Sequence, residues 1–350
     1  MVRRGVWLVG TVALTAGAFV VAIALAPAAN AQPTRALEWL LFVGSSVHVA
    51  STGWFYAVPE VRAHMRTHRG RYVIAPLALV LATAATALLL PSHLFTWLLL
   101  GFFGWQFFHF QKQNLGMAAL AGIAYGAGSV TPAERRALVV AGLAGTAGLL
   151  VHPELLQVTV DAQVRFLFPI AAVVFTVAVI AGGVLIARRS VRPATFVAVY
   201  LLSLVFFGPV FVFASPYAAV AGLTIAHGCQ YLLIVGLVAD ARGVTTVAMP
   251  APGRRAISLL VLLNLALIGG LALNAASHLH GGDAPARMLY GAYLGAVMAH
   301  FVIDAGLWRL RDEFPRTFLR DSLPYLLARP IVERAAPEPS ASAAAATSGG

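Results

Sequence analysis

Residues 287–308, RMLYGAYLGAVMAHFVIDAGLW, form an apolar run of the length that a helix needs to cross a lipid bilayer. Such a helix requires roughly 20 predominantly apolar residues. Nine other runs have the same character, which makes ten in all: 6–26, 37–58, 73–90, 94–110, 137–151, 166–187, 194–214, 217–238, 256–276 and 287–308. The sequence therefore predicts an all-α fold, a polytopic transmembrane bundle of about ten helices. The further apolar stretch 115–128 is a candidate for a re-entrant or interfacial segment that would change this count by one.

The composition supports this fold class. The chain has 350 residues, of which 60% are hydrophobic and only 11% are charged. Soluble domains are about half apolar and about one quarter charged, so this composition is typical of a membrane protein. Cys229 is the only cysteine, which excludes an internal disulfide and a cysteine-based metal cluster.

The distribution of basic residues predicts the orientation of the bundle. If the ten runs alternate in direction, one side of the membrane receives nearly all of the arginines and the only lysine, whereas the other side receives Arg35, Arg165 and Arg287. Cytoplasmic loops carry the excess of Lys and Arg, so we expect both termini in the cytoplasm. The net charge of +11 then reflects topology and anionic lipid, with no nucleic-acid partner. We expect a multi-pass protein of the bacterial inner membrane.

Four segments follow from these patterns. Residues 1–31 are a first transmembrane helix or a signal peptide, because Ala29-Asn30-Ala31 resembles a cleavage site. Residues 32–309 are the helical bundle. Residues 310–330 mix arginines with bulky apolar side chains, which predicts an amphipathic segment at the inner membrane surface. Residues 331–350 are a low-complexity tail that we expect to be disordered.

Ionisable and polar residues inside the apolar runs are the main indication of function. His300 and Asp304 are four residues apart, on one face of their helix. A carboxylate one turn from an imidazole can fix its tautomer or share a metal ion with it. A hydrogen-bonded pair that only joins two helices is the competing interpretation. An ionisable residue within a membrane span is rare and commonly functional.

His109, in WQFFHFQKQNLG, lies in the densest polar cluster of the chain. Gln106, His109 and Gln113 form one stripe of a helix. Because the apolar run ends near residue 110, the competing interpretation is a helix end that enters the cytoplasmic headgroups.

His227 and His48 complete the set. His227 has Gln230 at i+3 and Tyr231 at i+4, and Gly228 allows close approach of another helix or of a cofactor. His48 has Thr52 at i+4, and this hydroxyl could orient its second ring nitrogen. Interhelical hydrogen bonding explains either histidine when it is taken alone.

Taken together, these residues predict a metal site in the bundle core. Imidazole binds iron, copper and zinc, and a carboxylate favours iron or zinc over Cu(I). The predicted metal ligands are His48, His109, His227 and His300, and Asp304 and Gln230 are the candidate catalytic residues. The expected cofactor is non-haem iron, with copper or haem as alternatives, and the expected partners are the lipid bilayer and a lipophilic small molecule.

The motifs WQFFHFQKQNLG, AHGCQYLLIVG and HFVIDAGLWRLRD resemble those of a group of uncharacterised bacterial polytopic membrane proteins over most of residues 37–312. A more distant resemblance is to the Brp/Blh-type membrane β-carotene cleavage oxygenases, whose intramembrane histidines bind iron. His300 with Asp304 and His227-Gly228 carry this second resemblance. The His-x-x-x-His spacing of that family occurs at His64 and His68, among arginines and outside the apolar runs. The resemblance implies non-haem iron and an oxidoreductase.

Two other classes of function use the same residues. A proton-coupled transporter or permease would relay protons through the histidines or bind a solute there. A haem protein for electron transfer would use two of them, for example His48 and His227, as axial ligands. The substrate, the reaction and the oligomeric state stay open at this point.

Overall fold

The chain folds into helices that lie side by side in one bundle. In the computed structural model, residues 2–28, 31–160, 164–244 and 250–327 are described, and none of them lies in a β-strand. The long helices are α1 (Val2–Ala24), α6 (Ala75–Leu89), α7 (Ser92–Ala124), α8 (Pro132–Val151), α9 (Phe168–Ala187), α12 (Gly222–Ala241), α13 (Ala251–Ser277) and α14 (Ala284–Leu307).

Shorter helices connect or cap the long ones. The short α-helices are α2 (Arg35–Phe42), α3 (His48–Ser51), α4 (Trp54–Ala57), α5 (Pro59–Thr67), α10 (Ala194–Leu204), α11 (Gly208–Val212), α15 (Glu313–Ser322) and α16 (Pro324–Leu327). Three π-helical turns, η1 (Val43–Val47), η2 (Gly70–Ile74) and η5 (Tyr217–Ala221), and two 3₁₀ turns, η3 (Pro153–Leu156) and η4 (Arg165–Leu167), complete the described elements.

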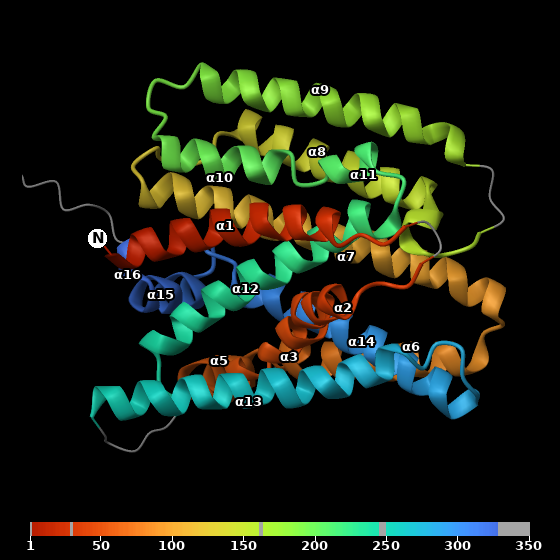
Figure 1. The fold of residues 1–350 in the computed structure, drawn as a ribbon. Helices are drawn as coiled ribbons and strands as arrows, with labels where there is room; N and C mark the ends of the chain where they lie inside the picture. Colours follow the sequence, from red (N-terminus) through yellow and green to blue (C-terminus); the bar gives the residue numbers. More distant parts are fainter. Residues whose placement is uncertain (1, 29–30, 161–163, 245–249, 328–350) are drawn as a thin grey trace, which may run out of the picture.

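Figure 1 shows α9 along one edge of the bundle and α13 along the opposite edge. Helix α12 crosses the interior obliquely between them. The principal pairs of packed helices are α6 with α14, α8 with α9 and α1 with α12. The α6–α14 pair has small residues at its interface: Gly291 and Gly295 of α14 both face Thr83 of α6, where an added Cβ would overlap it. Such small-x-x-x-small spacing lets membrane helices approach closely.

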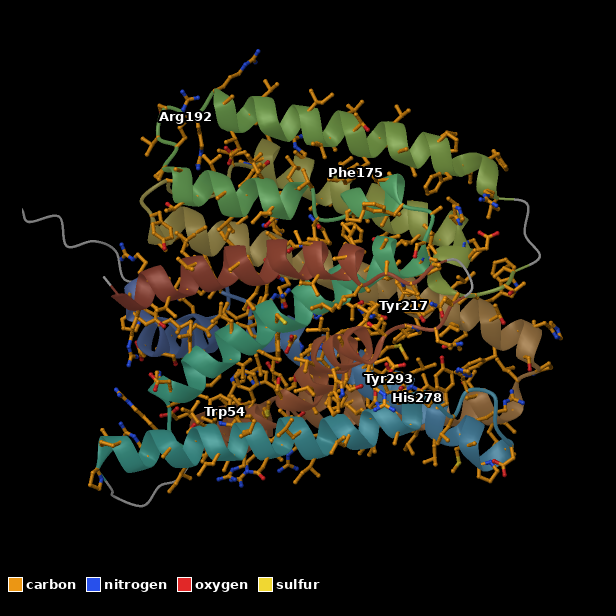
Figure 2. The ribbon with its side chains drawn as sticks, in the orientation of Figure 1. Trp54, Phe175, Arg192, Tyr217, His278 and Tyr293 are labelled. Atoms are coloured by element: carbon orange, nitrogen blue, oxygen red, sulfur yellow. The ribbon has the colours of Figure 1, made fainter. Side chains whose placement is uncertain are left out.

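The outer faces of the bundle are apolar. Val173, Val177 and Ile180 of α9 and Leu263 and Ile268 of α13 are exposed, and Figure 2 shows side chains projecting outward along both helices. Within the part of the chain that the structure describes, six helical segments are long and apolar enough to cross a membrane: Arg3–Ala24, Gly70–Leu89, Arg165–Ala187, Tyr217–Ala241, Ala251–Ser277 and Ala284–Leu307. The all-α fold is therefore confirmed, and the surface and the six segments indicate a multi-pass membrane protein. The count of about ten crossings stays a prediction.

Basic side chains from distant parts of the chain gather at one end of the bundle. Arg3 forms an ion pair with Asp240 at 3.0 Å, and Arg242 lies 3.6 Å from Glu60. Arg4 donates to the Tyr325 carbonyl oxygen at 2.8 Å, which brings the start of α1 to α16. This is the end at which Figure 1 places the N-terminus and α15, and Arg192 is labelled there in Figure 2. The loops that we predict to be cytoplasmic are thus on one side; which compartment they face stays a prediction.

Three of the segments predicted from the sequence have a different helical structure. The run 37–58 is divided into α2, η1, α3 and α4, and the run 194–214 is divided into α10 and α11. Helix α7, in contrast, continues from Ser92 to Ala124 and includes most of the stretch 115–128. That stretch is therefore neither a re-entrant nor a separate interfacial segment. The tail predicted for 331–350 lies outside the described residues.

Candidate metal centre

His48 directly follows a π-helical turn in its helix. The π-helical turn η1 ends at Val47, and His48 is the first residue of α3. Within this turn the Ser45 hydroxyl donates to the Leu41 carbonyl oxygen at 2.7 Å, a contact that bends helices. Single π-turns within α-helices are frequent at functional sites.

A pair of glycines brings His48 against α12. A Cβ built on Gly228 would overlap the carbonyl oxygen and the Cα of Gly44, and a Cβ on Gly44 would lie 2.6 Å from the Cα of Ile225. Only glycine at both positions permits this backbone contact. Because His227 precedes Gly228, the contact places the His227 ring beside that of His48.

The four predicted histidines form a closed ring. The centroids of neighbouring imidazoles are 5.0 Å apart for His48–His227, 5.0 Å for His227–His109, 5.2 Å for His109–His300 and 5.1 Å for His300–His48. The residues come from α3, α12, α7 and α14. The structure therefore brings together four imidazoles that are far apart in the sequence.

This ring is buried in the bundle. His48, His227 and His300 are almost fully buried, and the His109 side chain is 11% exposed. Phe110 stacks on His227 with centroids 4.0 Å apart, and Phe301 stacks on His109 at 4.5 Å. Aromatic rings therefore cover two of the imidazoles.

Asp304 lies at the edge of the ring. Its Oδ2 is 3.6 Å from His300 Nε2 and 4.0 Å from His109 Nε2. Two sets of three donor atoms, His48–His227–His300 and His109–His300–Asp304, each lie within 4.8 Å of one another, and His300 belongs to both. The expected partnership of His300 and Asp304 at i, i+4 is thus present in the geometry.

The donor set fits a metal ion by its distances. Two atoms that bind one ion at about 2.1 Å lie about 3.0–4.2 Å apart for angles between 90° and 180°. The two Asp304 distances fall in this interval. Imidazoles bound to one ion at angles between 90° and 109° have ring centroids about 4.6–5.3 Å apart. The four centroid distances agree with that range.

The donor set also contains unpartnered polar atoms. Among the described residues, both ring nitrogens of His48 and of His227, and Nε2 of His109 and of His300, are buried without a hydrogen-bond partner. Most buried polar side-chain atoms in proteins have a partner, and each exception needs an explanation. A bound cation would provide one for the nitrogens that face it, because a neutral imidazole nitrogen is a common metal ligand.

Thr52 and Tyr231 contact the site in a way that the sequence did not indicate. Thr52 Oγ1 is 2.7 Å from His300 Nδ1 and 2.9 Å from Tyr231 Oη, and the Tyr231 hydroxyl donates to Asp304 Oδ1 at 2.9 Å. The expectation that Thr52 orients His48 is therefore wrong, because its hydroxyl is engaged by residues of α12 and α14. The i+4 spacing of His227 and Tyr231 was the only signal for Tyr231.

The structure also defines the surroundings of Gln230 and His109. The Gln230 side chain donates to Thr15 Oγ1 at 2.7 Å and accepts from Gln113 Nε2 at 2.9 Å, so its amide connects α12 to α1 and α7. His109 lies near the middle of the 33-residue helix α7, so the interpretation of this region as a helix end is wrong.

The other histidines in the described part of the chain lie outside the two donor sets. His64 stacks on Phe314 with centroids 4.1 Å apart, and its ring is 4.3 Å from that of His68. His278 shares a hydrogen bond of 2.7 Å with the Asn274 carbonyl oxygen at the opposite end of the bundle.

The fold and this site together indicate an all-α, multi-pass membrane protein with a buried cluster of four histidines and an aspartate. Comparison of the chain with protein-family models, with curated protein sequences and with solved structures gave no match.

Proposed function

We propose that the chain is a membrane metalloprotein in which His48, His109, His227 and His300, with Asp304, hold one metal ion. The observation that supports this most strongly is the convergence of buried, unpartnered ring nitrogens from four helices beside a carboxylate. Burying polar groups without partners costs about 1–3 kcal/mol for each group. Metal binding would offset this cost for the nitrogens that coordinate the ion.

Non-haem iron is the metal that we propose, one of the two that the donor set suits. Four imidazoles and one carboxylate suit iron or zinc, and the carboxylate disfavours Cu(I). Haem fits the arrangement less well. Axial imidazoles bind on opposite faces of the macrocycle, whereas the His48 and His227 rings are in edge-to-face contact with centroids 5.0 Å apart.

A lipid-phase substrate is supported by a groove on the bundle surface. A cavity of about 620 Å³ lies between α13 and α14, with Ile268, Gly269 and Leu273 on one wall and Tyr293 on the other. Figure 2 labels Tyr293 beside α13. Ala50 of α3 also lines the groove, two residues from His48. We propose that an apolar chain from the bilayer binds in this groove.

The residues of the chain contribute orientation and exclusion of water. When bound, iron would supply Lewis-acid and redox chemistry. Phe110 and Phe301 cover the ring of imidazoles and limit the access of water to it. Asp304 Oδ1 accepts the hydrogen bond from Tyr231, which leaves Oδ2 directed toward His300 and His109.

Metal analysis of the purified protein tests this proposal. We expect about one iron per chain after reconstitution, and a large loss of bound iron in His227→Ala and in Asp304→Asn. The matched controls are His278→Ala and Asp283→Asn, because Asp283 caps the start of the same helix α14 far from the site.

Two results would contradict the proposal: wild-type protein that binds no metal under these conditions, or site variants that retain as much iron as the controls. Substrate-dependent uptake into proteoliposomes by a metal-free protein would favour the transporter. A Soret band in the visible spectrum would favour haem.

A further inference from the structure

Four side chains beside the histidine ring form a continuous hydrogen-bonded chain. His300 Nδ1, Thr52 Oγ1, Tyr231 Oη and Asp304 Oδ1 are joined by contacts of 2.7, 2.9 and 2.9 Å. All four residues are buried. This series of contacts starts and ends on α14 and passes through Thr52, which caps the C-terminal end of α3, and through α12.

The number of protons in this chain determines their positions. With Asp304 as the ionised carboxylate that binds a metal ion, the single proton of the Tyr231 hydroxyl is donated to Asp304 Oδ1. The contact between Thr52 and Tyr231 therefore requires the only proton of the Thr52 hydroxyl. The contact between Thr52 and His300 can then be a hydrogen bond only if His300 Nδ1 carries a proton.

We infer that Thr52 and Tyr231 are positioning residues that hold His300 as the Nδ1–H tautomer, so that the lone pair of its Nε2 faces the other three imidazoles and Asp304. A neutral imidazole has one N–H and one lone pair, and the hydrogen bond at one nitrogen selects which nitrogen binds a metal. This inference rests on the proposed function for what Nε2 binds. The tautomer itself requires only that Asp304 is ionised.

One consequence concerns the number of ions. His300 belongs to both donor sets, and a protonated Nδ1 cannot ligate. Both sets must therefore use Nε2 of His300, so the two sets cannot each hold an ion at the same time. Without the Thr52–Tyr231 chain, the two nitrogens of His300 could each serve a different ion.

Nitrogen-15 NMR of the metal-free protein with labelled histidine tests the inference. The His300 signals are assigned by their loss in His300→Gln. We expect His300 Nδ1 to have the chemical shift of a protonated ring nitrogen and Nε2 that of a lone-pair nitrogen. In Thr52→Val, His300 Nδ1 has no hydroxyl to which it can donate. We therefore expect the proton of the His300 ring on Nε2, beside Asp304. Thr52→Ser restores the hydroxyl and should restore the wild-type pattern.

Matched controls and a second readout separate this role from a purely structural one. Thr86→Val removes a hydroxyl that bonds only within α6, and Tyr290→Phe removes one that lies outside the chain of contacts; both should keep the wild-type tautomer. Loss of an outer hydrogen-bond partner commonly lowers metal affinity 10–100-fold, and we expect this range for iron in Tyr231→Phe.

A wild-type His300 with its proton on Nε2 would overturn the inference, and so would a Thr52→Val spectrum that is unchanged. If Thr52→Val does not fold, the position of the proton in the wild-type spectrum still decides. If the wild-type protein binds no metal, the proposed function is wrong. The NMR measurement of the His300 tautomer still confirms or contradicts the role of Thr52 and Tyr231.

Discussion

Single residues show how much the environment of a histidine depends on its neighbours. His300 and His64 are both four residues from another potential ligand, Asp304 and His68 respectively. His300 is buried among three imidazoles and a carboxylate. His64 lies on α5, stacked on Phe314, with Arg71 close enough to oppose its protonation. The same spacing thus accompanies a candidate metal ligand in one case and a basic surface in the other.

The pH dependence of His64 follows from these contacts. Partial burial, His68 and Arg71 lower the pKa of His64 below 6.5. Its protonation therefore favours the unfolded state, so its contribution to stability is present above pH 6.5 and is lost as the pH falls from 6.5 through the folded pKa. We expect an NMR titration to give a pKa below 6.5, and His68→Gln to raise it.

His280→Gln, at the other end of the bundle, is the matched control and should leave the titration of His64 unchanged. A pKa of His64 that does not rise in His68→Gln would show that the neighbouring imidazole has no influence.

At the scale of elements, the histidine ring depends on the contact between η1 and α12. The ten apolar runs were visible in the sequence because hydrophobicity alone defines them. The π-helical turn before His48 was not visible, because periodicity does not report a single inserted residue in a helix. The contact between Gly44 and Gly228 was not visible either, because it depends on two helices distant in sequence. The expectation that Thr52 orients His48 was wrong for the same reason, because the partners of Thr52 lie on helices distant in sequence.

Gly228→Ala tests the importance of this contact. The added methyl group would overlap the backbone of Gly44, and overpacking typically costs about 1–3 kcal/mol. We expect a lower free energy of unfolding and less bound iron, because His48 and His227 would be pushed apart. Thermal unfolding in detergent and metal analysis measure the two effects.

Gly236→Ala is the matched control on the same helix, because an added Cβ there meets no atom within 4 Å. Alanine has a higher helix propensity than glycine by roughly 0.5–1 kcal/mol, so this variant should be as stable as the wild type or slightly more stable. Equal behaviour of the two variants would contradict the role of the Gly44–Gly228 contact.

At the scale of the whole molecule, the charges and the apolar faces agree with one orientation in a bilayer. Arginines from the loops that we predict to be cytoplasmic meet at one end, where Arg3 pairs with Asp240 and Arg242 lies near Glu60. The sequence could predict this grouping because loop charge and alternation of spans are both local properties. The order of helices around the bundle, which brings α3, α7, α12 and α14 together, depends on packing between distant segments.

The predicted orientation can be measured with single cysteines. In a Cys229→Ser background, we expect Ser190→Cys to face the cytoplasm and Gly281→Cys to face the opposite side. Both positions are exposed. A membrane-impermeant thiol reagent added outside intact cells should label only Gly281→Cys, and both should be labelled after lysis. Labelling of Ser190→Cys alone in intact cells would show that the orientation is the opposite of the predicted one.

The central claim is that four imidazoles from four helices bind one ion. X-ray absorption at the iron edge of the reconstituted protein measures it most directly. We predict about four imidazole ligands at about 2.1 Å, with one fewer in His48→Ala and no second metal near the first. A spectrum dominated by oxygen ligands, or one that is unchanged in His48→Ala, would contradict the account.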